Sequence, residues 1–389
     1  MLALTAKTLF SPLEQIDEPL VLVENGIIIE VVSRASRELP AGCRRVDFRD
    51  AVLAPGFIDI HIHGAAGHDV MQGDAEALPA IERFLAQHGA SSYFPTTVTA
   101  PIDKTLSALE RLASAVELAQ KENSFDDGTR ARPLGIHLEG PFLSHRRRGV
   151  HPPEDLLQPS LKVFERLWQA SRGHAKVMTI APELEGAEEV IAEAARRGVC
   201  VSVGHSDADF KTTQAAVHAG ARHATHTFNA MRPLNHRDPG ILGEVLSDER
   251  VSADIIADGL HVDPAIVKLF LQAKGPDRSV LITDSTAATG MPDGTYSMGA
   301  FTFEVKDGKC LANGILAGSL LTMEQAVRNV MQFVQWDLKQ VLPSATMNPA
   351  RILRLGGRKG MLVSGAEADI AVLKPSGEVI RTIVCGTGI

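Results

Sequence analysis

The sequence of 389 residues has few cysteines and no long apolar run. Its four cysteines, Cys43, Cys200, Cys310 and Cys385, show no Cys-x-x-Cys spacing, which argues against a disulfide framework and against a thiolate zinc site. No apolar run reaches the roughly 18 residues of a membrane span, and the first residues lack the basic and apolar regions of a signal peptide. We therefore expect a reduced, cytoplasmic protein.

The chain also lacks an excess of positive charge. Its 39 Lys and Arg residues stand against 47 Asp and Glu residues, which gives a formal net charge of −8. A globally acidic surface does not attract polyanions, so we expect neither a nucleic acid nor a membrane as a partner. The length and a hydrophobic content of 44% suffice for a large core, and we expect one large domain and one smaller domain.

Both ends of the chain are rich in short β-like segments. Near the start, Leu20–Val23 and Ile27–Val32 flank Glu24-Asn25-Gly26, which is a hairpin signal. Near the end, Ala368–Leu373 and Val379–Val384 have the same character. We predict that residues 1–53 and 357–389 pair into a small β-sandwich domain, into which the rest of the chain is inserted.

Between these ends, short β-rich runs alternate with longer helical stretches. This alternation predicts parallel strands with crossover helices, and eight such units fit a (β/α)8 TIM barrel over residues 54–356. The charged stretch Lys121–Arg130 is the loop that we expect to be mobile. The predicted strands are Phe57–His61, Tyr93–Thr99, Leu134–Leu138, Val177–Ala181, Val199–Gly204, His223–Thr227, Val251–Ala257 and Val280–Thr283. The predicted helices include Glu76–His88, Lys104–Lys121, Ala187–Arg197, Phe210–Ala219, Pro264–Gln272 and Thr322–Val334.

Metal-ligating residue types gather where five of these predicted strands end. A TIM barrel places its chemistry at the carboxyl ends of its strands, and imidazoles with carboxylates are ligands of zinc and ferrous ions. One such residue would indicate little, but the coincidence of several at one end of the barrel predicts a metal centre. The residues are His61 and His63 after strand 1, Glu139 after strand 3, His205 after strand 5, His226 after strand 6 and Asp284 after strand 8.

Longer motifs surround these residues. They resemble the motifs of the N-acetylglucosamine-6-phosphate deacetylases, a family in the amidohydrolase superfamily of metal-dependent hydrolases. The resemblance runs from Pro55 to Ala350, so it covers nearly the whole chain. The motifs are Gly135-Ile136-His137-Leu138-Glu139-Gly140-Pro141-Phe142, Gly204-His205-Ser206, His226-Thr227-Phe228-Asn229-Ala230-Met231, Ala257-Asp258-Gly259-Leu260-His261-Val262-Asp263, Thr283-Asp284-Ser285-Thr286-Ala287 and Ala317-Gly318-Ser319.

The resemblance implies hydrolysis of the N-acetyl group of N-acetylglucosamine 6-phosphate, which gives glucosamine 6-phosphate and acetate in amino-sugar catabolism or recycling. It implies a divalent metal, Zn2+ or Fe2+, with one or two ions per chain. Glu139, His205 and His226 match the main metal ligands of the family. His61 and His63 match the ligands of a second ion, which some members of the family lack.

The remaining roles follow the same resemblance. Asp284 is the expected general base and acid, because one carboxylate can take a proton from the attacking water and give it to the leaving amine. His151 matches the histidine that helps to polarise the acetyl carbonyl. For both residues a structural role stays open, namely a further ligand or a helix cap for Asp284 and loop packing for His151.

A sugar phosphate needs donors far from the metal centre to anchor the phosphate. By resemblance, Asn229 and the Ala230 amide contact the substrate, and Arg237 and His261 bind the phosphate. His236 is a weaker candidate. In this family such a contact can come from the partner subunit, which implies a homodimer. We expect Arg146-Arg147-Arg148 to be a solvated face rather than part of the site.

Three alternatives stay open. The substrate could be the epimer, N-acetylgalactosamine 6-phosphate, because the two sugars differ in the orientation of one hydroxyl, and its recognition depends on details of the loops. A cyclic amide is disfavoured, because relatives of that kind bridge two metals with a carboxylated strand 4 lysine, whereas Lys176 here opens its strand at the opposite end of the barrel. A catalytically silent assembly protein with this fold should have lost metal ligands, and none is missing.

Overall fold

The computed structural model describes residues 1–121, 129–299 and 301–388. Eight parallel strands form its centre, and their apolar residues are buried on both faces, as expected for strands covered by helices. The strands are β8 (Phe57–Ile62), β11 (Ala90–Thr97), β13 (Ile136–Glu139), β14 (Ala175–Ile180), β15 (Cys200–Val203), β16 (His223–Ala224), β17 (Ala253–Ile256) and β18 (Ser279–Ile282).

These strands close into a ring. Strands β8, β11, β13, β14, β15 and β16 pair side by side in parallel, as do β17 and β18. The Ala224 amide donates to the Ser252 carbonyl at 3.0 Å and links β16 to β17. The Asp284 amide donates to the His61 carbonyl at 3.0 Å and links the end of β18 back to β8. The prediction of an α/β fold with a TIM-like barrel is confirmed.

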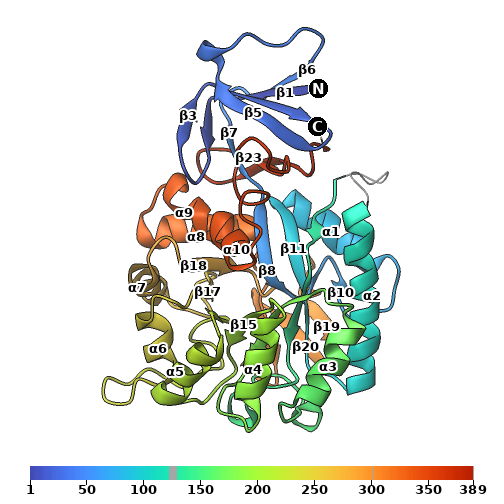
Figure 1. Ribbon diagram of the computed structural model, residues 1–389, viewed down its shortest axis with the longest axis vertical. Helices are drawn as coiled ribbons and strands as arrows, with labels where there is room; N and C mark the ends of the chain where they lie inside the picture. Colours follow the sequence, from blue (N-terminus) through green and yellow to red (C-terminus); the bar gives the residue numbers. More distant parts are fainter. Residues whose placement is uncertain (122–128, 300, 389) are drawn as a thin grey trace.

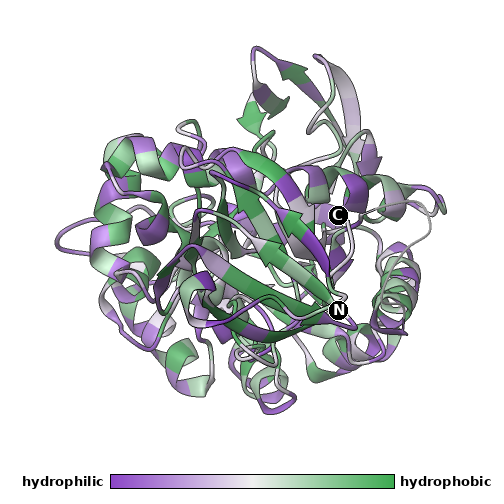
Figure 2. Ribbon diagram, turned by 90° about the horizontal axis from the view of Figure 1, so that it is seen from above, coloured by the Kyte–Doolittle hydropathy of each residue, from purple (hydrophilic) through white to green (hydrophobic). Residues whose placement is uncertain are grey.

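Helices surround the ring (Figure 1), and in Figure 2 these helices carry both purple and green residues. Polar caps fix several starts: Asp209 accepts from the Thr212 amide, and Asp337 forms a capping box with Gln340. The helices are α1 (Ala77–Gln87), α2 (Ile102–Lys121), α3 (Leu161–Ala170), α4 (Ala187–Arg196), α5 (Phe210–Ala219), α6 (Gly240–Ser247), α7 (Pro264–Lys274), α8 (Met323–Val334), α9 (Leu338–Ala345) and α10 (Met347–Ile352). Short 3-10 turns are η1 (Arg34–Ser36), η2 (His145–Arg147) and η3 (Pro153–Asp155).

Several predicted strands were too long at their carboxyl ends. The strand predicted over His223–Thr227 ends at Ala224, because His226 has a positive φ angle of 30°, which lies outside the extended region of a regular strand. The strand predicted over Leu134–Leu138 is observed as β13, which begins at Ile136, and a separate short strand, β12 (Arg132–Pro133), precedes it. The chain therefore leaves the extended conformation early where the polar residues begin.

An antiparallel sheet follows β18, and the sequence analysis did not predict it. Its strands are joined by turns at Asp307-Gly308 and Asn313-Gly314, with positive φ at all four residues. These dipeptides are strong hairpin signals that could have revealed it. Its apolar face packs on Val98 beside the ring. The strands are β19 (Gly294–Met298), β20 (Phe301–Lys306), β21 (Lys309–Ala312) and β22 (Ile315–Leu316). A short hairpin of β9 (Gly64–Ala65) and β10 (His68–Asp69) lies after β8.

Two further sheets lie at the end of the molecule that carries both termini (Figure 1). A four-stranded sheet has the order β5-β4-β1-β6, and a five-stranded sheet has the order β24-β23-β7-β2-β3. The second sheet joins both ends of the chain, because β7 pairs with both β2 and β23. The strands are β1 (Leu2–Thr5), β2 (Thr8–Phe10), β3 (Gln15–Asp17), β4 (Pro19–Glu24), β5 (Ile27–Ser33), β6 (Arg44–Asp47), β7 (Val52–Pro55), β23 (Ile370–Leu373) and β24 (Val379–Ile383).

The five-stranded sheet is apolar on both faces. Along β23, Ile370 and Val372 enter a small core that the two terminal sheets share, whereas Ala371 and Leu373 enter the large core of the barrel. This follows from the two-residue period of a strand. The sheet therefore connects the terminal sheets to the barrel through a continuous apolar contact.

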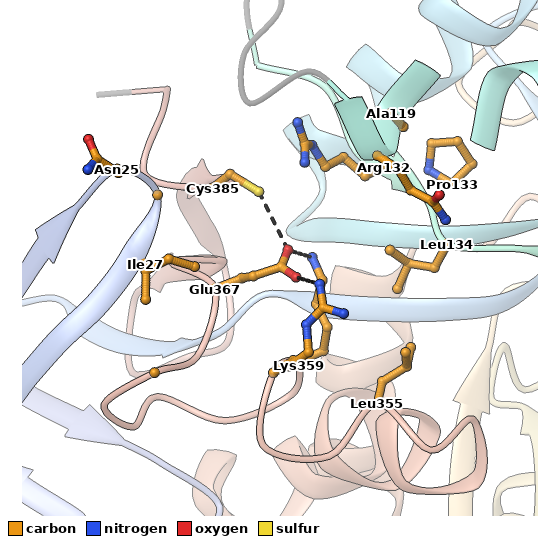
Figure 3. Close-up of a pocket in the computed structure, with 14 residues that line it drawn as sticks. Asn25, Ile27, Ala119, Arg132, Pro133, Leu134, Leu355, Lys359, Glu367 and Cys385 are labelled. Atoms are coloured by element: carbon orange, nitrogen blue, oxygen red, sulfur yellow. Dashed lines mark hydrogen bonds and ion pairs between the residues drawn. The ribbon is translucent and has the colours of Figure 1, made fainter. Parts of the chain in front are cut away.

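A buried ion cluster lies beside this contact. Lys359 is 4% exposed and lies 2.8 Å from Glu367, and it also contacts Asp369. Figure 3 shows Glu367 and Lys359 in a pocket with Asn25 of the terminal sheets on one side and Leu134 of the barrel on the other. A buried ion pair with its partners in place avoids the large cost of an isolated buried charge.

No helix among the described residues is long and apolar enough to cross a membrane. Of the loop Lys121–Arg130 that we expected to be mobile, residues 122–128 lie outside the described part of the chain.

Candidate active site

The six residues predicted to bind metal or move protons all lie at the carboxyl end of the ring. His61 and Glu139 stand at or next to the last positions of β8 and β13, and His63 follows β8 directly. The other three follow their strands by two residues and have positive φ: 46° at His205, 30° at His226 and 50° at Asp284. Such sparsely populated backbone conformations are common at functional sites.

The first group of ligand atoms surrounds one oxygen of Glu139. His226 Nε2 lies 3.0 Å and His205 Nε2 lies 3.2 Å from Glu139 Oε1, and the two Nε2 atoms are 3.1 Å apart. All three side chains are buried. Glu139, His205 and His226 are thus brought together as the sequence analysis expected.

The second group surrounds the other oxygen. His63 Nε2 lies 3.2 Å from Glu139 Oε2 and 3.2 Å from Asp284 Oδ1. His61 Nε2 lies 3.2 Å from His63 Nε2 and 3.5 Å from Asp284 Oδ1. Glu139 therefore stands between two groups of possible ligands, with one carboxylate oxygen toward each.

In His63 and His205, the hydrogen bond made by Nδ1 determines whether Nε2 carries a lone pair. His205 Nδ1 donates to the Arg147 carbonyl at 2.8 Å, and His63 Nδ1 donates to the Thr96 carbonyl at 3.0 Å. A carbonyl can only accept, so in neutral His63 and His205 the Nε2 atom carries a lone pair. Lone pairs and carboxylate oxygens then converge within about hydrogen-bond distance, an arrangement that a cation stabilises. The residues present fit a divalent metal.

Protons on the histidines can also compensate the negative charge of the carboxylates. Burial would lower the pKa of His226, but the hydrogen bond and charge of Glu139 raise it to about 9. Burial lowers the pKa of His205 to about 4 against the influence of Glu139. The charges of Asp284 and Asp254 also raise the pKa of His226, whereas the charges of His151 and His226 lower that of His205, so the two pKa values separate. Metal binding should therefore release protons from this group.

The carboxylates respond in the opposite direction. Burial would raise the pKa of Asp284, but the hydrogen bond from His63 and the charges of His61 and His226 lower it to about 2. Burial would also raise the pKa of Glu139, whereas the charge of His61 and hydrogen bonds from the surrounding histidines hold it well below its usual value. Both carboxylates are therefore ionised at neutral pH.

The proposed substrate residues are only partly gathered at this centre. Asn229, Ala230 and His261 line a cavity of about 250 Å³ together with the ligand groups and His151. Asn229 Nδ2 is buried without a hydrogen-bond partner among the described residues, and His261 Nδ1 lies 2.7 Å from Asp258. The apolar part of the wall is formed by Val98, Val150, Met298, Ile315 and Leu316.

Arg237 lies outside this cavity. Arg237 is exposed, and its backbone amide donates to Asn235 Oδ1 at 2.9 Å. His236 is exposed as well. Arg146 and Arg147 pair with Asp207 at 3.3 and 2.8 Å.

Some residues that hold the site together were not predicted. Asp254 is buried, lies 2.9 Å from His223 Nε2 and also accepts the His226 amide, so it fixes the turn that carries His226. A charged residue inside the apolar strand β17 is a signal that could have identified it. Lys176 lies near the start of β14 and donates to the Gly173 carbonyl at 2.9 Å, far along the strand from the ligand end.

The chain is similar to known proteins in sequence and in fold. Residues 52–388 match the Amidohydrolase family. The chain is 36% identical over 378 residues to N-acetylglucosamine-6-phosphate deacetylase of Lysinibacillus sphaericus, with 96% of this chain and 93% of that protein covered. It is 37% identical over 327 residues to N-acetylgalactosamine-6-phosphate deacetylase of Escherichia coli O157:H7, with 84% of each covered.

A solved structure is similar over nearly its full length. It is a mutant of N-acetyl-D-glucosamine-6-phosphate deacetylase from Mycobacterium smegmatis in complex with N-acetyl-D-glucosamine-6-phosphate, with a TM-score of 0.91 and 34% identity. The alignment covers 99% of this chain and 98% of that chain. From the matched motifs, the fold and the converging ligand groups, we conclude that this chain belongs to the amidohydrolase family.

Proposed function

We propose that this protein hydrolyses the N-acetyl group of N-acetylglucosamine 6-phosphate to give glucosamine 6-phosphate and acetate. The observation that carries the proposal is the convergence of His205, His226 and Glu139, with Asp284 beside them, in a chain that is 36% identical over 378 residues to an N-acetylglucosamine-6-phosphate deacetylase. The reaction would serve amino-sugar catabolism or recycling.

Glu139, His205 and His226 would hold the principal metal, and His61 and His63 would hold a second ion that shares Glu139. When bound, a divalent Zn2+ or Fe2+ ion polarises the acetyl carbonyl and acidifies water. The choice between these metals, and between one ion and two, belongs to the proposal.

Asp284 is the proposed proton carrier. Its Oδ1 faces the ligand groups, and its carboxylate is ionised at neutral pH, as a group that accepts a proton from the attacking water must be. It then delivers this proton to the leaving amine. His151 lies at the same cavity, with its Nε2 3.5 Å from Glu139 Oε2, and would donate a hydrogen bond to the oxygen that becomes negative.

Asn229, the Ala230 amide and His261 would orient the sugar within the cavity, and His261 and Arg237 would bind the phosphate. Because Arg237 projects from an exposed segment outside the cavity, we propose a homodimer in which it reaches the site of the partner subunit. Orientation of the acetamide by such a remote anchor lowers the entropy cost of the reaction.

We also propose that residues 1–53 and 357–389 form a small β-sandwich domain and residues 54–356 the catalytic barrel. The shared core of the two terminal sheets supports this division. The four free cysteines support a cytoplasmic location.

The direct test is acetate release by the purified protein loaded with Zn2+ or Fe2+, with phosphorylated and unphosphorylated N-acetylglucosamine compared. We expect a kcat/KM at least about 100-fold higher for the phosphorylated sugar, because a charge-assisted anchor contributes several kcal/mol. No acetate release with either metal would refute the proposal.

N-acetylgalactosamine 6-phosphate is a second candidate substrate. The specific observation in its favour is the 37% identity to a relative of that name. Side-by-side kcat/KM values for the two epimers distinguish the candidates. A cyclic amide is disfavoured by the position of Lys176, and a silent assembly protein is disfavoured because every predicted ligand is present and converges.

A further inference from the structure

His151 differs from the neighbouring histidines in what its Nδ1 atom meets. His63 and His205 each turn Nδ1 toward a backbone carbonyl. His151 Nδ1 instead lies 3.2 Å from the Thr99 amide nitrogen, which donates to it, and 2.8 Å from the Thr99 hydroxyl. An amide N–H can only donate, so Nδ1 of His151 must accept. In neutral His151 the proton therefore resides on Nε2.

We propose that Thr99 is a positioning residue that holds His151 as the Nε2–H tautomer, which makes His151 a hydrogen-bond donor to the substrate carbonyl and excludes it from metal coordination. The part that concerns the substrate rests on the proposed deacetylase function. The part that concerns the tautomer and the metal rests on the contacts alone.

The distinction matters because His151 lies close enough to be a ligand. The possible ligand atoms of Glu139, His151 and His205 lie within 4.8 Å of one another, and His151 Nε2 is 3.5 Å from Glu139 Oε2. A nitrogen that carries a proton has no lone pair in the ring plane to offer a metal. His205, with Nδ1 as its donor, keeps that lone pair, and His151 does not.

The surroundings make the Thr99 contact persistent. Thr99 and His151 are 2% and 3% exposed, so water does not compete for Nδ1. The loop that carries His151 is held at that point, since the Arg148 guanidinium donates to the His151 carbonyl at 3.0 Å. A low local dielectric strengthens both hydrogen bonds and raises the cost of losing them.

Gly140 provides the space for this arrangement. A Cβ atom at Gly140 would lie 2.1 Å from Thr99 Oγ1, and its φ of +84° disfavours any other residue. The glycine that follows the bridging Glu139 thus leaves room for the hydroxyl that reaches His151. The sequence motif around Glu139 therefore serves both the metal ligands and the donor.

Nuclear magnetic resonance of the zinc-loaded full chain with 15N-labelled histidine tests the tautomer without substrate. The His151 signals are identified by their absence in His151→Gln. We expect the proton on Nε2 of His151 and on Nδ1 of His205. A proton on Nδ1 of His151 would overturn the proposal. This result stands even if the protein releases no acetate, so it fails separately from the proposed function.

Two pairs of variants test the role in the reaction. Gln places its amide donor near the position of Nε2 and Asn does not reach it, so His151→Gln should keep a kcat about 10-fold above that of His151→Asn. Both should keep the wild-type metal content. Reduced metal content in both variants would show that His151 is a ligand and overturn the proposal.

Thr99→Val keeps the amide donor but loses the hydroxyl, and Thr99→Ser keeps both. We expect Thr99→Val to lower kcat about 10-fold with KM within about 2-fold of the wild type, and Thr99→Ser to restore most of the rate. A wild-type kcat in Thr99→Val, or equal losses in both variants, would overturn the role of the hydroxyl.

Discussion

Asp284 Oδ1 lies 3.2 Å from His63 Nε2, so the carboxylate proposed to carry the proton directly contacts a histidine of the second ligand group. The contact links proton transfer by Asp284 to the presence of a metal ion in the second ligand group. It also contributes to the low pKa of Asp284, because the hydrogen bond from His63 and the charges of His61, His63 and His226 together outweigh the effect of burial.

Replacement of Asp284 by Asn should remove the proton carrier and leave the shape of the site unchanged. We expect kcat to fall about 10³-fold, within the range found for general acid–base catalysis, with KM nearly unchanged. Acetate release and metal content measure the two effects. Asp103→Asn is the control, because its side chain is 91% exposed and remote from the cavity. Full activity in Asp284→Asn would contradict the assignment.

Glu139→Gln should disturb both ligand groups at once, because each group contacts one of its oxygens. The neutral amide cannot compensate the charge of two ions, so we expect metal content to fall for both and activity to fall at least about 100-fold. Elemental analysis of the dialysed protein measures the metal. Glu193→Gln, on the outer helix α4, should retain the wild-type content.

The two ligand groups should respond differently to the loss of one histidine. His205→Ala should abolish binding of the principal metal and nearly all deacetylase activity. His63→Ala should retain binding of the principal metal and a measurable kcat. Metal content per chain and kcat for both variants check this expectation. Equal losses in the two variants would mean that the two ions bind only together.

Arg237→Met should weaken binding of the phosphorylated substrate while leaving the chemistry intact. We expect KM to rise about 10- to 100-fold for the phosphorylated sugar and to stay constant for the unphosphorylated one, because a charged hydrogen bond is worth about 1.5–3 kcal/mol. Arg250→Met, which removes the pair of the exposed Arg250 with Asp248, is the control. If Arg237 acts across a dimer, mixed dimers of Arg237→Met and Asp284→Asn chains should regain part of the activity.

The ion cluster at the terminal sheets predicts how stability depends on pH. Burial would raise the pKa of Glu367, but the charge of Lys359 and hydrogen bonds from Lys359 and Arg358 hold it below its ordinary value of 4.5. A carboxyl group with a lowered pKa stabilises the fold above its ordinary value. That contribution is lost as the pH falls through the lower folded pKa. Urea midpoints should therefore decline below about pH 4.5.

Lys359→Met should leave Glu367 and Asp369 as buried charges without their shared cation. We expect a loss of about 3–5 kcal/mol in the free energy of unfolding at pH 7 and a weaker decline in acid. Lys374→Met is the matched control, because its pair with Glu378 is exposed and should contribute less than about 1 kcal/mol. A loss of equal size in both variants would contradict this account.

Local sequence determined the order of the strands and most of the helices. Apolar runs such as Phe57–Ile62 and caps such as Asp209 act over a few residues, so they can be recognised one at a time. The sheet over Gly294–Leu316 was missed although its turns carry hairpin signals, because it interrupts the alternation of strands and helices in the barrel.

The sequence by itself determined which residue types stand at the strand ends, and hence the family and the ligand set that we propose. Only the tertiary structure decided which residues group together as ligands and which role each histidine can take. It divides the ligands between the two oxygens of Glu139 and separates His151 from His205 by the group that each Nδ1 meets. The hydrogen bonds among those contacts join residues 52 to 66 positions apart in the chain, and only closure of the barrel brings them within hydrogen-bond distance.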